Sequence, residues 1–226
     1  MDRTLVGSHS TLFANLEPIT LTREVEFFFD VGSPASYLAY TQLPRICEET
    51  GATLIYRPML LGGVFHATGN ASPAAIPAKG RYIFGDLERH ARRYPVPFKR
   101  NPYFPIHTLL LMRGATAMQL RHAERFHTYL GAVFRAIWVD ERDMNDASVV
   151  AGVLHEAGLD AAMVMAEITD PEVKAALKST TEEAVARGVF GAPSFFIGDT
   201  MFFGQDRLEF VREALAAPHS APLVSR

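Results

Sequence analysis

Ser33 and Ser36 stand three residues apart, directly after an apolar run and on either side of a proline. The run, residues 25–30, is rich in aromatic side chains, which predicts a buried strand. Pro34 suits the first position of a helix, and Ser33 suits the N-cap before it. Thiol redox proteins place Cys-x-x-Cys at such a junction, because a helix N-terminus stabilises a thiolate. Since both positions are serine here, we expect the site to act on a thiolate that a ligand brings.

Two other interpretations of Ser33 stay open. The first is structural, because a serine before a proline commonly does no more than cap the helix. The second is nucleophilic catalysis, which needs a base held by an orienting group and is often marked by G-x-S-x-G, a motif that the chain lacks. The histidines are scattered, and neither His122 nor His127 lies in an H-E-x-x-H motif. We therefore expect no metal site.

A second candidate segment is Gly191-Ala192-Pro193-Ser194, just before a predicted strand. An ordinary trans bond is the default for Pro193, since few X-Pro bonds are cis. A thioredoxin-like site has a cis proline at this place, which leaves the backbone N–H and C=O of the preceding residue free to pair with an extended peptide. Position and topology agree, and we expect Pro193 to be cis and Ala192 to contact the ligand.

The third segment, Gly204-Gln205-Asp206-Arg207, opens the last predicted helix. Asp206 could be a plain N-cap. In the functional interpretation, free N–H groups and Gln205 hold a carboxylate while Asp206 takes an ammonium. The γ-glutamyl end of glutathione presents both groups, and its cysteine would then reach Ser33.

The pattern along the chain predicts how these segments are positioned. A strand, a helix from Pro34 and a second strand form a βαβ unit. Glycines and prolines in residues 60–80 predict a loop, and a long helical block follows. Two strands joined by Gly198-Asp199 and a final helix form a ββα unit. The fold class is therefore α/β, a thioredoxin-like fold with a large all-helical insertion between the βαβ and ββα halves. We expect a thioredoxin-like domain of residues 23–59 and 189–217, an insertion of 60–188, an N-terminal extension of 1–22 and a tail of 218–226.

Composition limits the function classes. The formal net charge of −3 over 226 residues favours neither nucleic acid nor an anionic membrane as a partner. No stretch is long and apolar enough to predict a membrane span. The single cysteine, Cys47, excludes an internal disulfide and a CxxC metal site. A reducing compartment, the cytoplasm, is the simplest expectation.

Three motifs in this order, Ser-Pro-Ala-Ser-Tyr-Leu, Gly-Val-Phe-Gly-Ala-Pro-Ser-Phe and Phe-Gly-Gln-Asp-Arg-Leu, resemble one family. It is the 2-hydroxychromene-2-carboxylate isomerases, close kin of the kappa-class glutathione transferases within the DsbA-like group. The resemblance covers roughly residues 24–215. It implies a thioredoxin fold with a helical insertion, glutathione as cofactor, a small aromatic carboxylate as substrate and a homodimer.

The resemblance also implies residue roles. Ser33 matches the serine that hydrogen-bonds the glutathione sulfur, and Ala192 beside Pro193 matches the residue that pairs with the cysteinyl backbone. Asn70 and Lys79 match family positions near glutathione and substrate, where a lysine suits anionic ligands. Gln205 and Asp206 match the γ-glutamyl anchor. With Lys79, the substrate-binding residues would include Tyr82 and His107, the latter standing where the family has an asparagine.

The expected activity is a glutathione-dependent isomerisation in aromatic catabolism. Three alternatives remain: glutathione S-transfer of the kappa type, a non-enzymatic thioredoxin-fold module that binds peptide at the cis-proline edge, and a disulfide oxidoreductase, which the missing active-site cysteines argue against.

Overall fold

One four-stranded mixed sheet organises the chain, in the order β2-β1-β3-β4. The computed structural model describes residues 23–217, so the predicted extension and tail lie outside the described residues. β1 (Glu24–Phe29) runs parallel to β2 (Thr53–Pro58) and antiparallel to β3 (Ser194–Ile197), and β3 pairs antiparallel with β4 (Thr200–Phe203). The predicted βαβ and ββα halves are confirmed.

The other regular elements of the described chain are helical. α1 (Pro34–Thr50) joins β1 to β2, and α9 (Leu208–Ala216) follows β4 after a 3₁₀ turn at Gln205–Arg207. The insertion between β2 and β3 consists of α2 (Leu61–Thr68), a 3₁₀ turn at Pro73–Ala75, α3 (Pro77–Arg93), α4 (Leu109–Arg121), α5 (Ala123–Trp138), α6 (Ala147–Glu156), α7 (Ala161–Glu167) and α8 (Pro171–Ala186). The predicted helical insertion is therefore confirmed.

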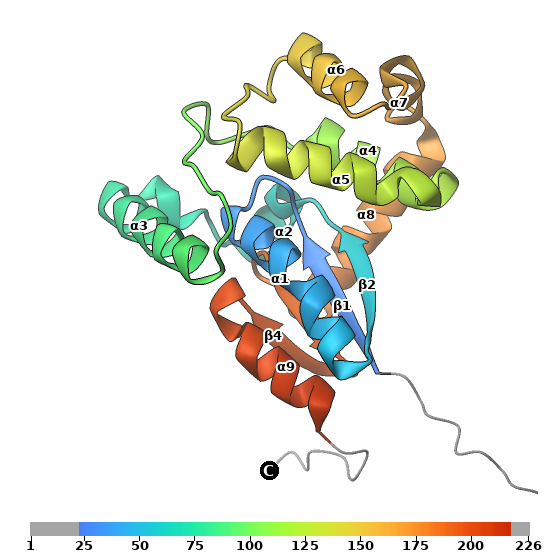
Figure 1. The fold of residues 1–226 in the computed structure, drawn as a ribbon. Coiled ribbons are helices and arrows are strands. Elements are labelled where there is room, and N and C mark those ends of the chain that lie inside the picture. The colour runs from blue at the N-terminus through green and yellow to red at the C-terminus, as the bar shows by residue number, and fades with distance from the viewer. Residues whose placement is uncertain (1–22, 218–226) are drawn as a thin grey trace, which may run out of the picture.

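Helices cover both faces of the sheet, with α1 and α9 in front and α8 behind it in the view of Figure 1. Successive side chains of a strand point to opposite faces, and β1 is apolar on both. Phe27 and Phe29 join the large core cluster on the α1 side, whereas Phe28 packs with Val64 of α2 and Ala184 of α8. Burial on two faces explains why β1 has a continuous apolar run instead of an alternating one.

The insertion shares the core of the sheet. Phe134 of α5 lies against Tyr40 of α1, with ring centroids 4.9 Å apart, and 6.2 Å from the ring of Phe29. Helices of the insertion and helices of the thioredoxin-like part thus contribute to one buried cluster. The residue boundaries proposed for two domains stay a prediction, since the two parts are continuous in their packing.

Some predicted elements were wrong in detail. The expected loop of residues 60–80 contains α2, because Leu61, Val64 and Phe65 recur at helical spacing and outweigh the cost of two glycines. Apolar residues at helical spacing from Ile106 to Arg121 predict a helix there, and that helix begins at Leu109. The helix expected from Asp206 starts as a 3₁₀ turn and becomes α-helical at Leu208.

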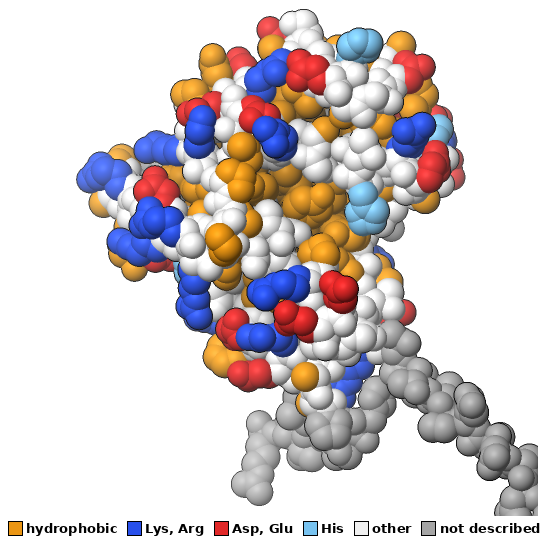
Figure 2. Space-filling view, viewed as in Figure 1, with side chains coloured by type: hydrophobic (Ala, Val, Ile, Leu, Met, Phe, Trp, Pro, Cys, Tyr) orange, Lys and Arg blue, Asp and Glu red, His pale blue; other side chains and the backbone are white. Residues whose placement is uncertain are grey.

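The described surface is basic at one end. Lys and Arg side chains gather on the end of the molecule that α3 forms (Figure 2), where Lys79, Arg81, Arg89, Arg92 and Arg93 are all exposed. Within residues 23–217, no helix combines the length and the apolar composition needed to span a bilayer. The basic end matters because α3 also forms one wall of the cavity described next.

Candidate active site

Ser33 lies at the N-terminus of α1, where it is 5% exposed. Its Oγ accepts a hydrogen bond from the Ser36 backbone N–H at 3.1 Å and donates one to the Ala192 carbonyl oxygen at 3.0 Å. The first bond is the helix cap that the structural interpretation expected, and Pro34 occupies the first turn. The second bond shows that capping does not use up the hydroxyl: its proton points to the backbone before Pro193.

The Ala192–Pro193 peptide bond is cis, as predicted. The Pro193 carbonyl accepts a hydrogen bond from the Gly204 N–H at 3.0 Å. That bond brings the start of the last helical segment, with Gln205 and Asp206, to the same edge as the Ser33 loop. The Ser33 loop thus meets two segments that lie more than 150 residues later in the sequence.

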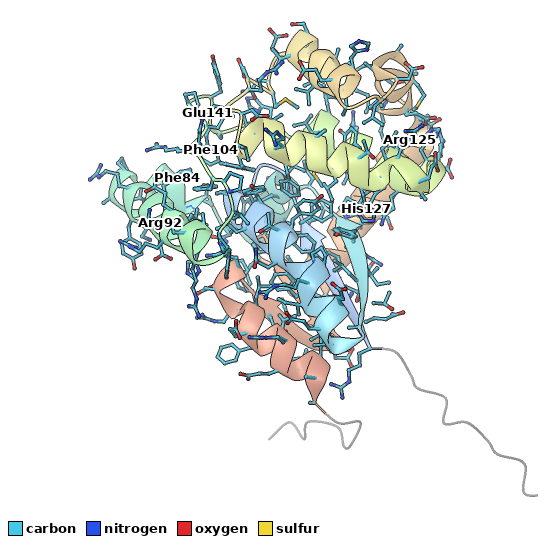
Figure 3. The ribbon with its side chains drawn as sticks, viewed as in Figure 1. Phe84, Arg92, Phe104, Arg125, His127 and Glu141 are labelled. Carbon is cyan, nitrogen blue, oxygen red and sulfur yellow. The ribbon has the colours of Figure 1, made fainter. Side chains whose placement is uncertain are left out.

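A cavity of about 320 Å³ opens where they meet. Five of the predicted site residues line it: Ser33, Asn70, Ala192, Gln205 and Asp206. Its other walls are largely apolar, from Leu61 and Phe65 of α2, Ile83 and Phe84 of α3, and Phe104. Figure 3 shows Phe84 and Phe104 side by side, and their rings meet edge to face at 5.5 Å. The cavity thus combines a polar end at the α1 N-terminus with an apolar wall that suits an aromatic body.

Asn70 and Gln205 are both held by neighbouring segments. The Asn70 amide donates to the Phe190 carbonyl at 2.8 Å, and its oxygen accepts from the Ala71 N–H at 2.9 Å. Gln205 is buried, and its backbone carbonyl accepts from the Tyr94 hydroxyl at 2.8 Å. Asn70 therefore ties the loop before α3 to the chain that leads into the cis proline.

Asp206 does not cap α9. The N-cap of α9 is Arg207, and no side chain caps that helix. The Asp206 carboxylate is exposed and pairs with the Arg207 guanidinium at 2.8 Å. It remains accessible at the cavity rim, where an ammonium could compete for it.

Pro193, whose carbonyl accepts from the Gly204 N–H, does not itself line the cavity, and three further predicted residues lie outside its walls. Lys79 is exposed in the first turn of α3, one turn before Ile83. Tyr82 is 67% exposed and carries the Arg89 guanidinium over its ring. His107 is also exposed, with its backbone N–H bonded to the Asn145 side chain. Their substrate-binding roles stay predictions.

Asp30 supports the loop that carries Ser33, and the sequence analysis did not single it out. It is 1% exposed, the single carboxyl among the buried polar groups of residues 23–217. Its oxygens accept hydrogen bonds from the Gly32 N–H at 2.9 Å, the Leu61 N–H at 2.8 Å and the Thr108 hydroxyl at 3.0 Å. One carboxyl thereby joins the Ser33 loop to the starts of α2 and α4.

Burial raises the pKa of Asp30, and its three hydrogen bonds oppose that shift only in part. The sequence does carry a signal for Asp30, because this acid ends an apolar strand two residues before Gly32. Its partners, however, come from distant segments.

The loop around Val31 is anchored from the insertion as well. The Trp138 indole N–H donates to the Val31 carbonyl at 2.8 Å, and the Val31 N–H lies 3.3 Å from the Met112 sulfur. Gly32 has no room for a side chain, because a Cβ there would lie 2.7 Å from the Thr108 methyl group. The loop that carries Ser33 is thus held at several consecutive residues, which preorganises the hydroxyl.

Other catalytic arrangements find less support in the described residues. Cys47 is buried in α1, and burial raises the pKa of its thiol to about 11, far from a reactive thiolate. In the described part of the chain, no group of three or more His, Cys, Asp or Glu side chains could hold a metal ion.

These features define a class: a thioredoxin fold with serine at the active-site helix and a cis proline opposite it. Residues 24–216 match the family model described as a DSBA-like thioredoxin domain, and the chain belongs to this family. The family resemblance seen in the sequence is thereby confirmed.

Two relatives are similar to this chain over most of its length. The chain is 32% identical over 200 residues to the 2-hydroxychromene-2-carboxylate isomerase of Sphingobium xenophagum, an alignment that covers 86% of this chain and 99% of the relative. It is 32% identical over 215 residues to human glutathione S-transferase kappa 1, covering 90% and 95% of the two chains. The relatives are thus enzymes of two reaction classes.

Solved structures agree in fold. A 2-hydroxychromene-2-carboxylate isomerase superposes with a TM-score of 0.75 at 28% identity, over 85% of this chain and 94% of the other. The cytosolic disulfide reductase DsbM of Pseudomonas aeruginosa superposes with a TM-score of 0.58 at 17% identity, over 85% and 95%. The second likeness shows the fold alone.

Proposed function

We propose that this chain is a glutathione-dependent isomerase that acts on 2-hydroxychromene-2-carboxylate-like substrates in aromatic catabolism. The observation that supports this most is the hydrogen bond between Ser33 and Ala192 at the wall of a mixed polar and apolar cavity. An isomerase relative, similar over nearly its whole length, supports the same reaction class.

The cavity residues fit glutathione group by group. Asp206 would take the γ-glutamyl ammonium, and Gln205 with the N–H groups around it would hold the neighbouring carboxylate. Ala192 would pair through its backbone with the cysteinyl residue, in the manner of an added strand. Asn70 and Lys79 stand on the side of the loop and α3. When bound, glutathione supplies a thiolate that can add to a conjugated carbon of the substrate and leave again.

The residues of the chain would activate that thiol without a base. The N-terminus of α1 has no acid in its first turn, so its partial positive charge is not offset there. On binding, the Ser33 hydroxyl would turn its proton from the Ala192 carbonyl to the sulfur, and that carbonyl would accept the cysteinyl N–H instead. Each group thus exchanges one hydrogen bond for another, while the thiol pKa falls.

The substrate would lie against the apolar wall from α2, α3 and Phe104, which excludes water from the reacting carbon. Lys79 would pair with its carboxylate, and Tyr82 and His107 would complete that side. A homodimer in a reducing compartment, the cytoplasm, belongs to the same proposal.

Glutathione S-transfer is the second candidate, supported by the relative of the kappa class. Activation would be the same, but the product would retain the sulfur. The isomerase and transferase reactions can be separated by turnover of a chromene carboxylate, with the free thiol titrated before and after the reaction. Constant glutathione with an isomerised product supports the isomerase, whereas loss of free thiol and a stable adduct support the transferase.

The first experiment is calorimetric binding of reduced glutathione, with the ultraviolet difference spectrum of the bound thiol. Saturable binding with thiolate absorbance near neutral pH is expected. Absence of binding at millimolar glutathione would overturn both candidates and favour a peptide-binding module. S-methylglutathione is the matched control, because it binds through the same anchors but has no thiol to ionise.

A further inference from the structure

A second and larger cavity, of about 650 Å³, lies between α2, α4 and α8. Its floor is apolar, formed by Leu60, Leu109, Leu177 and Val185. This volume is within the range of about 300–1,000 Å³ that holds small molecules in proteins. The cavity shares no lining residue with the Ser33 cavity.

Arg113 of α4 lines this cavity and is partly buried. Across residues 23–217 it is the one partly buried arginine to which no hydrogen bond, ion pair or ring contact belongs. Arg57, for comparison, pairs with Glu26 and Glu183. Its guanidinium nitrogens are not among the buried, unpaired polar atoms of the described chain, so the group is open to the cavity and can pair with an anion that enters it.

Further cations stand at the same opening. Lys174 and Lys178 lie one turn apart on α8, and His66 faces them from α2. Of the two lysines, Lys178 pairs with Glu182 at 3.3 Å, whereas Lys174 has no ion pair within the described chain. With Glu182 neutralised in this way, the opening keeps an excess of positive charge above an apolar floor.

We propose that this cavity binds an organic monocarboxylate with an apolar body, the carboxylate meeting Arg113 and Lys174 and the body lying on the leucine floor. The charge complementarity selects an anion, and the apolar floor excludes inorganic phosphate as the favoured ligand. This site is independent of the proposed glutathione chemistry.

The wall between the two cavities is α2. Leu61 and Phe65 face the Ser33 cavity, while Gly63, His66 and Ala67 face the second one. The close approach of Gly63 to Thr181, where an added Cβ would lie 3.2 Å from the Thr181 methyl group, shows how tightly α2 rests on α8. A ligand in the second cavity therefore contacts the same helix that shapes the first.

The test uses octanoate, with octanol as the uncharged probe, in calorimetry and thermal unfolding of the whole chain. Octanoate is expected to bind saturably and to raise the unfolding temperature, and octanol to bind roughly tenfold to a hundredfold more weakly, as for loss of a charge-assisted hydrogen bond. Arg113→Gln should weaken octanoate by a similar factor and leave octanol unchanged. The unfolding temperature of Arg113→Gln without ligand should not fall, because Arg113 has no partner to lose among the described residues.

Arg125→Gln is the matched control, since Arg125 is exposed on α5, outside both cavities (Figure 3). Equal affinity for octanoate in wild type and Arg113→Gln would overturn the proposal. So would octanoate binding that Asn70→Asp abolishes, which would assign it to the Ser33 cavity, because Asn70 lines that cavity and the new carboxylate would repel the ligand. If octanoate does not bind and the wild-type chain is a dimer that Arg113→Gln dissociates, the proposal is also overturned. The cavity face would then be an interface with a second copy of the chain. Glutathione binding is measured on the same samples. A failure of the second-cavity proposal can then be distinguished from a failure of the glutathione proposal.

Discussion

The Ser33 hydroxyl donates its proton to the Ala192 carbonyl oxygen across 3.0 Å, joining the α1 N-terminus to the cis-proline segment. Both groups are ones that a peptide thiolate would need, one as donor and one as acceptor. Within the described chain the two groups bond to each other, so neither is left as a buried unpaired group. A ligand that offers one N–H and one thiolate can replace this bond without leaving a polar atom unsatisfied.

Ser33→Ala should lower the unfolding free energy by about 1 kcal/mol, because the N-cap is lost, and should raise the pKa of bound glutathione thiol. Ser36→Ala is the control: the Ser36 Oγ is buried and has no hydrogen-bond partner in the described structure. Chemical denaturation and the thiolate spectrum measure both effects. Equal behaviour of the two variants would remove the role assigned to Ser33.

Asp206→Asn should weaken glutathione binding roughly tenfold, since the amide keeps its shape but loses the charge that faces an ammonium. Arg207→Gln breaks the same ion pair from the other side and should leave binding unchanged or tighter. Calorimetry decides. If both variants weaken binding alike, Asp206 acts only through Arg207.

Asp30→Asn should destabilise the fold by about 1–3 kcal/mol, the cost of a buried donor left unsatisfied. The Asp30 oxygens face two backbone N–H groups from opposite ends, so the amide NH₂ must meet one of them. Thr108→Val removes only the hydroxyl bond and should cost less. Denaturation of the three proteins at one pH tests this order.

The stability difference between wild type and Asp30→Asn should depend on pH, with a defined sign. Because burial raises the pKa of Asp30 above 3.8, the folded chain holds this proton more tightly than the unfolded chain. Its contribution to stability is therefore full below pH 3.8 and is lost as the pH rises through the folded pKa. The difference in unfolding free energy between wild type and Asp30→Asn should therefore decrease as the pH rises above about 4. An advantage that grows with pH would show that the hydrogen bonds outweigh desolvation.

Gly114→Ala should destabilise the chain by about 1–3 kcal/mol through overpacking. A Cβ at Gly114 would overlap the Tyr129 hydroxyl, which is fixed by its bond to the Leu111 carbonyl. Gly85→Ala is a matched helical control with open space around it, and should stabilise by about 0.5–1 kcal/mol. Thermal unfolding distinguishes the two signs. A neutral Gly114→Ala would mean that α4 and α5 can separate without cost.

Cys47 should react slowly with iodoacetamide near neutral pH, because its thiol pKa is raised to about 11 and its side chain is buried. Labelling in denaturant provides the full rate for comparison. Cys47→Ser should leave glutathione-dependent turnover unchanged. Rapid labelling of the folded chain, or loss of turnover, would reopen a redox role.

Local chemistry determined a large part of this protein in advance. Ser33 and Pro34 indicate a helix start, and Gly51 its end, because capping involves residues within one turn of each other. The strand pattern and the Gly198-Asp199 turn likewise predicted the two halves of the sheet. The three motifs also identified the segments that meet at the site, including the cis Pro193.

Only the tertiary structure decided which groups complete the site. Ser33 meets Ala192 across 159 residues, Asp30 meets Thr108 across 78, and Val31 meets Trp138 across 107. Such partners depend on how helices pack against the sheet, which no short pattern encodes. That Arg113 has no partner within residues 23–217 is the same kind of finding, because it becomes visible only once the described neighbours are placed. Sequence spacing thus identified the segments of the site, and long-range packing determined the hydrogen bonds and cavities between them.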